Sequence, residues 1–207
     1  MKQDYIVIKN AIPSELCRFI STEFRMFETM FNIMRPNFQN DGINHAFAEY
    51  CLPFMEALSL YLQPTIEKLL DKKLYPSYSY GRIYKTGSEL PKHVDRRSSE
   101  YTLSCCLEKD PEDWALCFEN YNKEVFKVDL NEGDIVLYQG RKYLHWRDGP
   151  FKGQEQVQAF IQYVDANGDS TDLKWDGKPA MSLPYDYVPE WHRKEIEESY
   201  NNYERYI

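Results

Sequence analysis

Two of the four histidines in this chain of 207 residues have a spacing that suits metal coordination. His93 begins the triplet His93-Val94-Asp95. Residues two apart in a strand face the same side, so the imidazole of His93 and the carboxylate of Asp95 would converge on one point. His145 follows later, after a strand-turn-strand pattern over residues 129–138. The sequence therefore predicts a metal site formed by His93, Asp95 and His145.

The ligand set of such a site determines its chemistry. Two histidines and one carboxylate form the facial triad that binds Fe(II) and leaves adjacent coordination positions open. Two of these positions suit a bidentate 2-oxo acid, and the third suits O₂. An oxygen-activating enzyme needs these open positions, so the triad indicates an iron-dependent oxygenase.

Composition and charge exclude or disfavour several classes of protein. Hydrophobic content of 43% with 15% aromatic residues is typical of a globular chain. The net charge of −8 argues against a protein that binds nucleic acid, although Lys92, Arg96 and Arg97 form a local basic patch. No segment approaches the roughly 18 consecutive apolar residues that a membrane helix needs. A membrane-spanning protein is therefore excluded. An enzyme that acts on nucleic acid, for example by demethylation, is disfavoured by the net charge.

The five cysteines predict free thiols. Their number is odd, and Cys105 and Cys106 are adjacent in a predicted strand, where they would face opposite sides. Such a pattern does not form a disulfide framework. It favours reduced core thiols in a cytoplasmic protein.

The elements that must position these residues change character along the chain. A short strand is expected at 5–9, a helix from Pro13, and a second helical region over 45–72, interrupted or bent near Pro53 and Pro64. Short strands rich in β-branched and aromatic residues follow at 78–84, 101–107, 115–118, 125–130, 134–138 and 157–164. Residues 190–206 predict a polar terminal helix.

This order of elements predicts one α+β domain over residues 1–207. It would consist of a helical N-terminal part at 1–72, a β core at 73–166 and a C-terminal extension with a helical tail at 167–207. Evenly spaced short strands are typical of an antiparallel sandwich or barrel, so the core is expected to be a barrel or jelly roll with the N-terminal helices packed on it.

The motifs also resemble a known family. The run from Tyr84 through His93-Val94-Asp95, the strand at 101–107, the turn Asn131-Glu132-Gly133-Asp134 and then His145 resemble the Fe(II)/2-oxoglutarate-dependent dioxygenases, in particular their prolyl-4-hydroxylase-like branch. The sequences His93-Val94-Asp95-Arg96 and His145-Trp146-Arg147 look like a microbial or viral variant. The resemblance covers most of residues 5–165 and implies a double-stranded β-helix core.

The resemblance implies roles for individual residues. His93, Asp95 and His145 would bind Fe(II), and the hydroxyl of Tyr84 would contact the co-substrate 2-oxoglutarate. The family places an arginine or lysine on the strand after the last histidine, where it pairs with the distal carboxylate of the co-substrate. Here those positions are Gln154, Glu155 and Gln156, of which Gln156 matches best.

A glutamine supplies no charge, so another cation would have to replace the usual anchor. The candidates are Arg147, Arg82, Arg96 and Lys152. Arg147 is the first candidate, because it lies two residues after His145 and would share its side in an extended segment. Arg82 is the second, since its strand leads into Tyr84. The other open explanations are a different co-substrate or a loss of turnover.

The predicted activity is hydroxylation of a C–H bond, with O₂ and 2-oxoglutarate as co-substrates. The resemblance implies a prolyl-type peptide residue, a free amino acid or another small molecule as the substrate. The alternative is a pseudo-oxygenase, a β-barrel that binds metal without catalysis and acts in interactions. The absence of the usual anchor is the observation that supports it.

Overall fold

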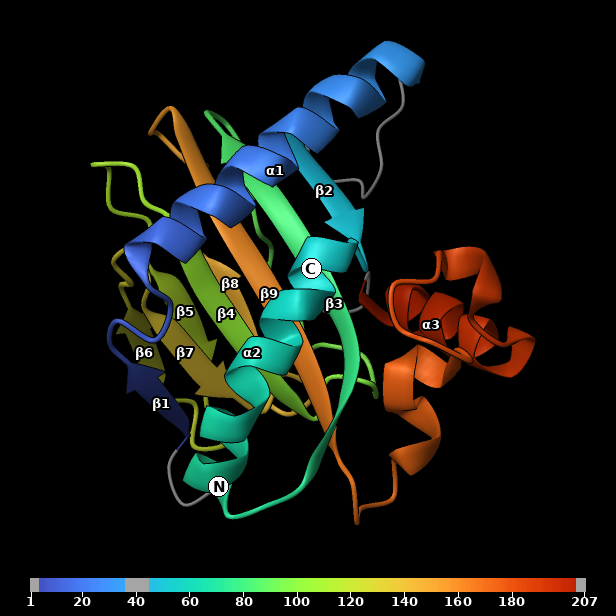
Figure 1. Ribbon diagram of the computed structural model, residues 1–207. Coiled ribbons are helices and arrows are strands. Elements are labelled where there is room, and N and C mark those ends of the chain that lie inside the picture. Colours follow the sequence, from blue (N-terminus) through green and yellow to red (C-terminus); the bar gives the residue numbers. More distant parts are fainter. Residues whose placement is uncertain (1–3, 36–44, 204–207) are drawn as a thin grey trace.

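The computed structural model describes residues 4–35 and 45–203, which form two antiparallel sheets flanked by helices (Figure 1). The strand order is β1-β7-β4-β9-β3-β2 in the larger sheet and β6-β5-β8 in the smaller one. The strands are β1 Tyr5–Ile8, β2 Ala46–Tyr50, β3 Leu74–Lys85, β4 Tyr101–Glu108, β5 Leu116–Glu119, β6 Val125–Val128, β7 Ile135–Tyr138, β8 Leu144–Arg147 and β9 Glu155–Asp165. The helices are α1 Ser14–Met34, α2 Pro53–Leu70, the 3-10 helices η1 Thr171–Gly177 and η2 Tyr185–Tyr187, and α3 Glu190–Tyr203. The predicted α+β class is confirmed.

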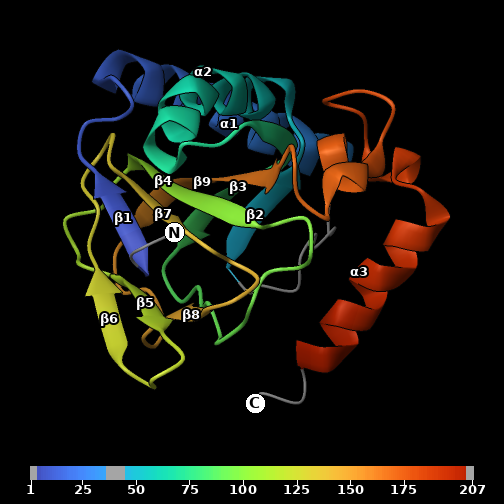
Figure 2. The ribbon, with the colours of Figure 1, turned by 90° about the horizontal axis from the view of Figure 1, so that it is seen from below.

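The two faces of the larger sheet have different neighbours. Helices α1 and α2 cover its outer face, and the smaller sheet lies on the opposite side (Figure 2). Side chains alternate between the faces. In β4, Leu103 and Cys105 belong to the apolar cluster under the helices, whereas Cys106 belongs to the cluster on the other side. The expectation that the two adjacent cysteines face opposite sides is thus confirmed.

The helices begin where proline favours it. Pro13 immediately precedes α1, and Pro53 is the first residue of α2. Proline suits the start of a helix because the first N–H groups have no partner within the helix. Pro64 lies inside α2 and does not interrupt it.

Residues 46–50 were expected to be helical, but they form strand β2. This strand pairs with β3 along its whole length, and Phe47 packs against Phe24 of α1 with ring centroids 5.4 Å apart. These tertiary contacts outweigh the local preference. Strand β8 is a further element that the sequence pattern did not predict. In the described part of the chain, no helix has the length and apolar character needed to span a membrane.

The C-terminal extension lies beside the β2–β3 edge of the larger sheet (Figure 1). It comprises η1, η2 and α3, and η1 packs on β3. Leu173, Val188 and Ile196 are buried, which attaches the extension to the rest of the protein. The expected terminal helix is confirmed as α3.

Candidate metal centre

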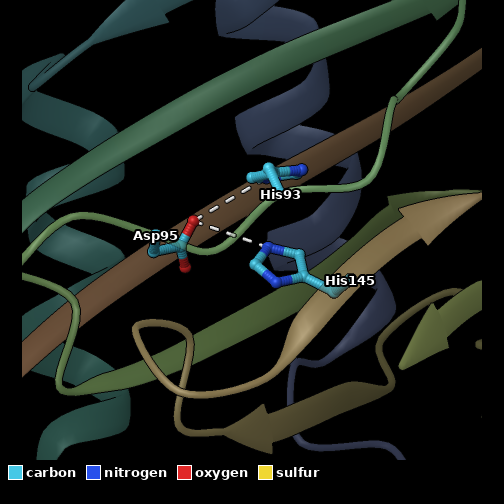
Figure 3. A group of neighbouring side chains, drawn as sticks. All are labelled: His93, Asp95 and His145. Carbon is cyan, nitrogen blue, oxygen red and sulfur yellow. Dashed lines mark ion pairs between the residues drawn. The ribbon is translucent and has the colours of Figure 1, made fainter. Parts of the chain in front are cut away.

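His93, Asp95 and His145 lie together between the two sheets. One ligand atom from each residue lies within 4.8 Å of the others (Figure 3). The Oδ1 atom of Asp95 is 3.8 Å from Nε2 of His93 and 3.5 Å from Nε2 of His145. Two imidazole nitrogens and one carboxylate oxygen therefore face a common point, as the spacing predicted.

Backbone pairing brings the two histidines together. The triplet His93-Val94-Asp95 belongs to a connecting segment before β4, so the two-residue spacing of a strand does not account for the convergence of His93 and Asp95. His93 instead forms a single antiparallel bridge with His145 of β8. The N–H of His145 donates to the carbonyl of His93 at 2.8 Å, and the reverse bond is 3.0 Å.

Both imidazole rings are oriented by backbone carbonyls. Nδ1 of His93 lies 2.8 Å from the carbonyl oxygen of Pro91, and Nδ1 of His145 lies 3.0 Å from that of Tyr143. A proton on each Nδ1 is donated to these oxygens, which puts the unprotonated lone pair of each ring on Nε2. In metal sites, a hydrogen bond from the ring nitrogen that does not bind the metal orients the histidine in the same way.

Two residues that the sequence pattern did not single out, Thr102 and Gly140, hold Asp95 in place. Oδ2 of Asp95 accepts a hydrogen bond from the hydroxyl of Thr102, which is also 2.7 Å from Oε1 of Gln162. The N–H of Asp95 donates to the carbonyl of Gly140. A Cβ atom on Gly140 would lie 2.0 Å from Oδ2 of Asp95, so this position requires glycine. In the sequence, only the alternation of polar and apolar residues around Thr102 and Gln162 could have indicated that these two side chains face the site.

The electrostatics of the site suit metal ligands. Burial lowers the pKa of His93 to about 3, and the neighbouring His145 adds to this effect. Burial alone would raise the pKa of Asp95, but the two imidazoles and Thr102 lower it to about 2. At neutral pH His93 is therefore neutral and Asp95 is ionised, the states in which they can bind a metal.

The remaining predicted site residues line the same space between the sheets. Arg82 and Tyr84 lie two residues apart in β3 and therefore share one face, and Gln156 lies opposite Tyr84 on β9. Nη1 of Arg82 donates a hydrogen bond of 3.0 Å to the hydroxyl of Tyr84. Tyr84 is fully buried, and its ring packs edge-on against Trp114. The structure thus brings Arg82, Tyr84 and Gln156 together.

Arg147 approaches this group from the smaller sheet. Its side chain is buried, and its guanidinium group lies 5.0 Å from the ring of Trp114 and 5.8 Å from that of Tyr84. Nη1 donates to the backbone carbonyl of Trp114, whereas Nε is buried without a hydrogen-bond partner. Within residues 4–35 and 45–203, no carboxylate lies within ion-pair distance of Arg147.

Two polar atoms of the larger sheet also have no hydrogen-bond partner. They are Oε1 of Gln158 on β9 and Oγ of Ser104 on β4. Buried polar groups are normally hydrogen-bonded, so each exception needs an explanation.

Comparisons with known proteins identify the fold. No family model matches the chain, and no curated protein matches its sequence. Solved structures do match. A prolyl-4-hydroxylase from Pseudomonas putida is 14% identical, with a TM-score of 0.60 over 78% of this chain and 92% of that chain. HygX from Streptomyces hygroscopicus, solved with nickel and 2-oxoglutarate, is 14% identical, with a TM-score of 0.60 over 89% and 95%.

A third similar structure is a viral collagen prolyl hydroxylase from Paramecium Bursaria Chlorella virus-1, solved as a 2-oxoglutarate complex. It is 16% identical, with a TM-score of 0.58 over 78% of this chain and 95% of that chain. At such low identity these likenesses establish the fold alone. The chain has the antiparallel, sheet-rich α+β fold of these oxygenases.

Proposed function

We propose that the protein is an Fe(II)- and 2-oxoglutarate-dependent oxygenase of the prolyl-4-hydroxylase-like type, with a double-stranded β-helix core. The convergence of His93, Asp95 and His145 between the two sheets carries this proposal. The fold supports it, since similar structures were solved with iron, with nickel and with 2-oxoglutarate.

The three side chains fit a divalent iron. Each histidine presents Nε2 because its Nδ1 faces a backbone carbonyl. With the carboxylate of Asp95 they make the facial donor set that suits non-haem Fe(II). When bound, iron supplies O₂ activation for the oxidation of a C–H bond, coupled to conversion of 2-oxoglutarate to succinate and CO₂. The protein's own residues hold the donor atoms and exclude water from the space between the sheets.

Arg147 is the proposed anchor for the distal carboxylate of 2-oxoglutarate, in place of the basic residue absent at 154–156. A buried guanidinium without a carboxylate partner is costly, and an anionic ligand would remove that cost. The unpartnered Nε of Arg147 is the observation that supports this assignment. Tyr84 would donate its hydroxyl proton to the same carboxylate while it accepts from Arg82. Gln156, opposite Tyr84, would contribute a neutral contact.

The proposed substrate is a prolyl-type residue in a peptide or a small amino-acid-like molecule. Its support is limited to the similar structures, which include prolyl hydroxylases. A cytoplasmic location is proposed from the cysteines. All five are free, and burial raises the pKa of Cys17 and Cys51 to about 12, which makes these thiols unreactive.

Anaerobic spectroscopy tests the function. Addition of Fe(II) and then 2-oxoglutarate should produce the weak visible charge-transfer band expected of this family, and admission of O₂ should yield succinate. His145→Ala should abolish both signals, whereas His45→Ala, at an exposed histidine, should keep them. Metal binding without a band or succinate would instead favour the pseudo-oxygenase.

A further inference from the structure

The C-terminal extension contacts the segment that carries Asp95. Arg96 follows Asp95 directly, and its side chain is only 10% exposed. Its Nη2 lies 2.9 Å from Oδ2 of Asp176 in η1, a carboxylate with no exposed surface. A second ion pair joins Arg97 to Asp172 at 2.8 Å, but both of these side chains are partly exposed. The buried pair is therefore the stronger tie.

Asp176 has further partners on two elements. The hydroxyl of Tyr50 in β2 donates to its Oδ2 at 2.5 Å, and Nε2 of His192 in α3 lies 2.8 Å from its Oδ1. Burial alone would raise the pKa of Asp176, but Arg96 and His192 hold it well below its usual range. The carboxylate thus stays ionised and joins β2, α3 and the ligand segment.

Arg96 is enclosed on its other side by the larger sheet. Its guanidinium group lies 3.9 Å from the ring of Tyr78 in β3, a distance that corresponds to close stacking. The hydroxyl of Tyr78 is 2.9 Å from that of Ser99. The side chain of Arg96 therefore lies between β3 and the extension, and little freedom remains for the backbone of residues 95–99.

The backbone around Asp176 is strained. Trp175 and Asp176 have φ values of +54° and +60°, in the left-handed region that non-glycine residues rarely adopt. Such conformations persist only where the surrounding contacts impose them, and they cluster at functional sites. Here the turn directs the carboxylate of Asp176 toward Arg96.

We propose that Asp176 is a positioning residue of the metal centre, which acts on Asp95 through Arg96. This inference rests on the proposed metal site at His93, Asp95 and His145. Asp95 is tied to Gly140 and Thr102 on one side, and the Arg96–Asp176 pair fixes the chain that leaves it on the other. The C-terminal extension is thereby an integral part of the iron site, and not a separate appendage.

Metal titration of two matched variants tests the proposal. Asp176→Asn removes the buried charge with little change in size, and Asp172→Asn removes the partly exposed charge of the same helix. We expect Asp176→Asn to weaken Mn(II) binding to the metal-free protein by about 10- to 100-fold, the usual effect of losing a residue that supports a ligand. Asp172→Asn should stay within about 3-fold of the parent, since exposed ion pairs contribute little.

A purely structural role would give a different result. Asp176→Asn would then lower the melting temperature of the metal-free protein, but the folded fraction would bind Mn(II) like the parent. The absorption spectrum of the Co(II) form is a second readout, because it reports ligand geometry. An unchanged Mn(II) affinity and Co(II) spectrum in folded Asp176→Asn would overturn the proposal.

Tyr50→Phe decides the question if Asp176→Asn does not fold. It removes one donor to Asp176 and leaves both charges in place. A weakening of Mn(II) binding by about 3- to 10-fold, with an unchanged fold, supports the proposal, and parent-like affinity overturns it. If the parent itself did not bind Mn(II), both the metal site and the role of Asp176 would be overturned. If the parent binds Mn(II) and the variants bind it equally well, only the role of Asp176 is overturned.

Discussion

The segments that carry Asp95 and His145 each continue into a buried arginine, but the two arginines have opposite surroundings. Arg96 faces the C-terminal extension and pairs with the buried carboxylate of Asp176. Arg147 faces the space between the sheets and contacts aromatic rings and a backbone carbonyl. Among the residues that the structure describes, Arg147 has no carboxylate partner.

The pKa values of the two groups reflect this difference. Burial lowers the pKa of Arg147, and the neighbouring groups do not compensate. Burial also acts against the charged form of Arg96, but Asp176 reverses the effect and raises its pKa well above the usual value. A buried cation that has its own carboxylate serves the structure. One without a carboxylate suits an anion that arrives from solution.

The largest expected effect is on the paired arginine. Arg96→Gln leaves Asp176 buried without its cation, and breaking a buried pair from one side costs about 3–5 kcal/mol of unfolding free energy. Arg97→Gln is the matched control, because its ion pairs with Asp172 and Glu195 are partly exposed and each is worth at most about 1 kcal/mol. Urea unfolding of both variants gives the comparison. Equal losses of unfolding free energy in the two variants would show that the buried pair contributes no more to stability than the partly exposed one.

Arg147→Gln should affect ligand binding more than folding. No buried carboxylate loses its partner, so the unfolding free energy should change by about 1 kcal/mol or less. Loss of a charge-assisted bidentate contact should weaken 2-oxoglutarate binding to the Mn(II) form by about 1.5–3 kcal/mol, or roughly 10- to 150-fold. Mn(II) affinity should not change, because the ligands are untouched.

Arg82→Gln is the parallel variant, because Arg82 was the second candidate and contacts Tyr84. Calorimetric titration of the parent and of both variants with 2-oxoglutarate ranks the two cations. Unchanged affinity in both variants would contradict a replacement anchor. No measurable affinity in the parent would favour the pseudo-oxygenase or a different oxo acid.

A smaller effect is expected from a change at Gly140, which lies against the carboxylate of Asp95. Gly140→Ala would place a methyl group against the carboxylate of Asp95, so the side chain must shift. Mn(II) affinity should fall by about 10- to 100-fold, in the range found when the surroundings of a ligand are disturbed. Gly149→Ala is the control: its φ of +62° makes it strained as well, but its Cβ would meet no atom within 4 Å. Parent-like affinity in Gly140→Ala would show that the site tolerates the shift.

The sequence predicted which residues converge better than it predicted the elements that hold them. The convergence of His93 and Asp95 requires only that their two side chains point to the same side. They do so although the triplet lies outside the strands. Arg147 shares the inner side with His145 because β8 is extended there, as the sequence argument assumed.

Long-range contacts determined what the sequence pattern could not predict. Strand β2 forms because β3, which follows only after α2 in the chain, pairs with it and Phe24 of α1 packs on it. Gly140 is required because Asp95 folds back against it from a distant segment. Asp176 and His192 looked like residues of a polar tail, and only the folded chain places them around Arg96. Such roles depend on tertiary contacts that leave no local pattern.

The smallest expected effect concerns the hydroxyl of Thr102. It donates a 2.9 Å hydrogen bond to Oδ2 of Asp95, the oxygen that does not face the histidines. Thr102→Val keeps the shape of the side chain and removes this bond together with the 2.7 Å contact to Oε1 of Gln162, and the bond to Asp95 is worth about 0.5–1.5 kcal/mol. Mn(II) affinity should therefore fall by roughly 2- to 10-fold. Ser104→Ala, two residues along the same inner face, removes a hydroxyl without a partner and should leave Mn(II) affinity unchanged. If both variants bound Mn(II) like the parent, Gly140 and the Arg96–Asp176 pair would suffice to hold Asp95.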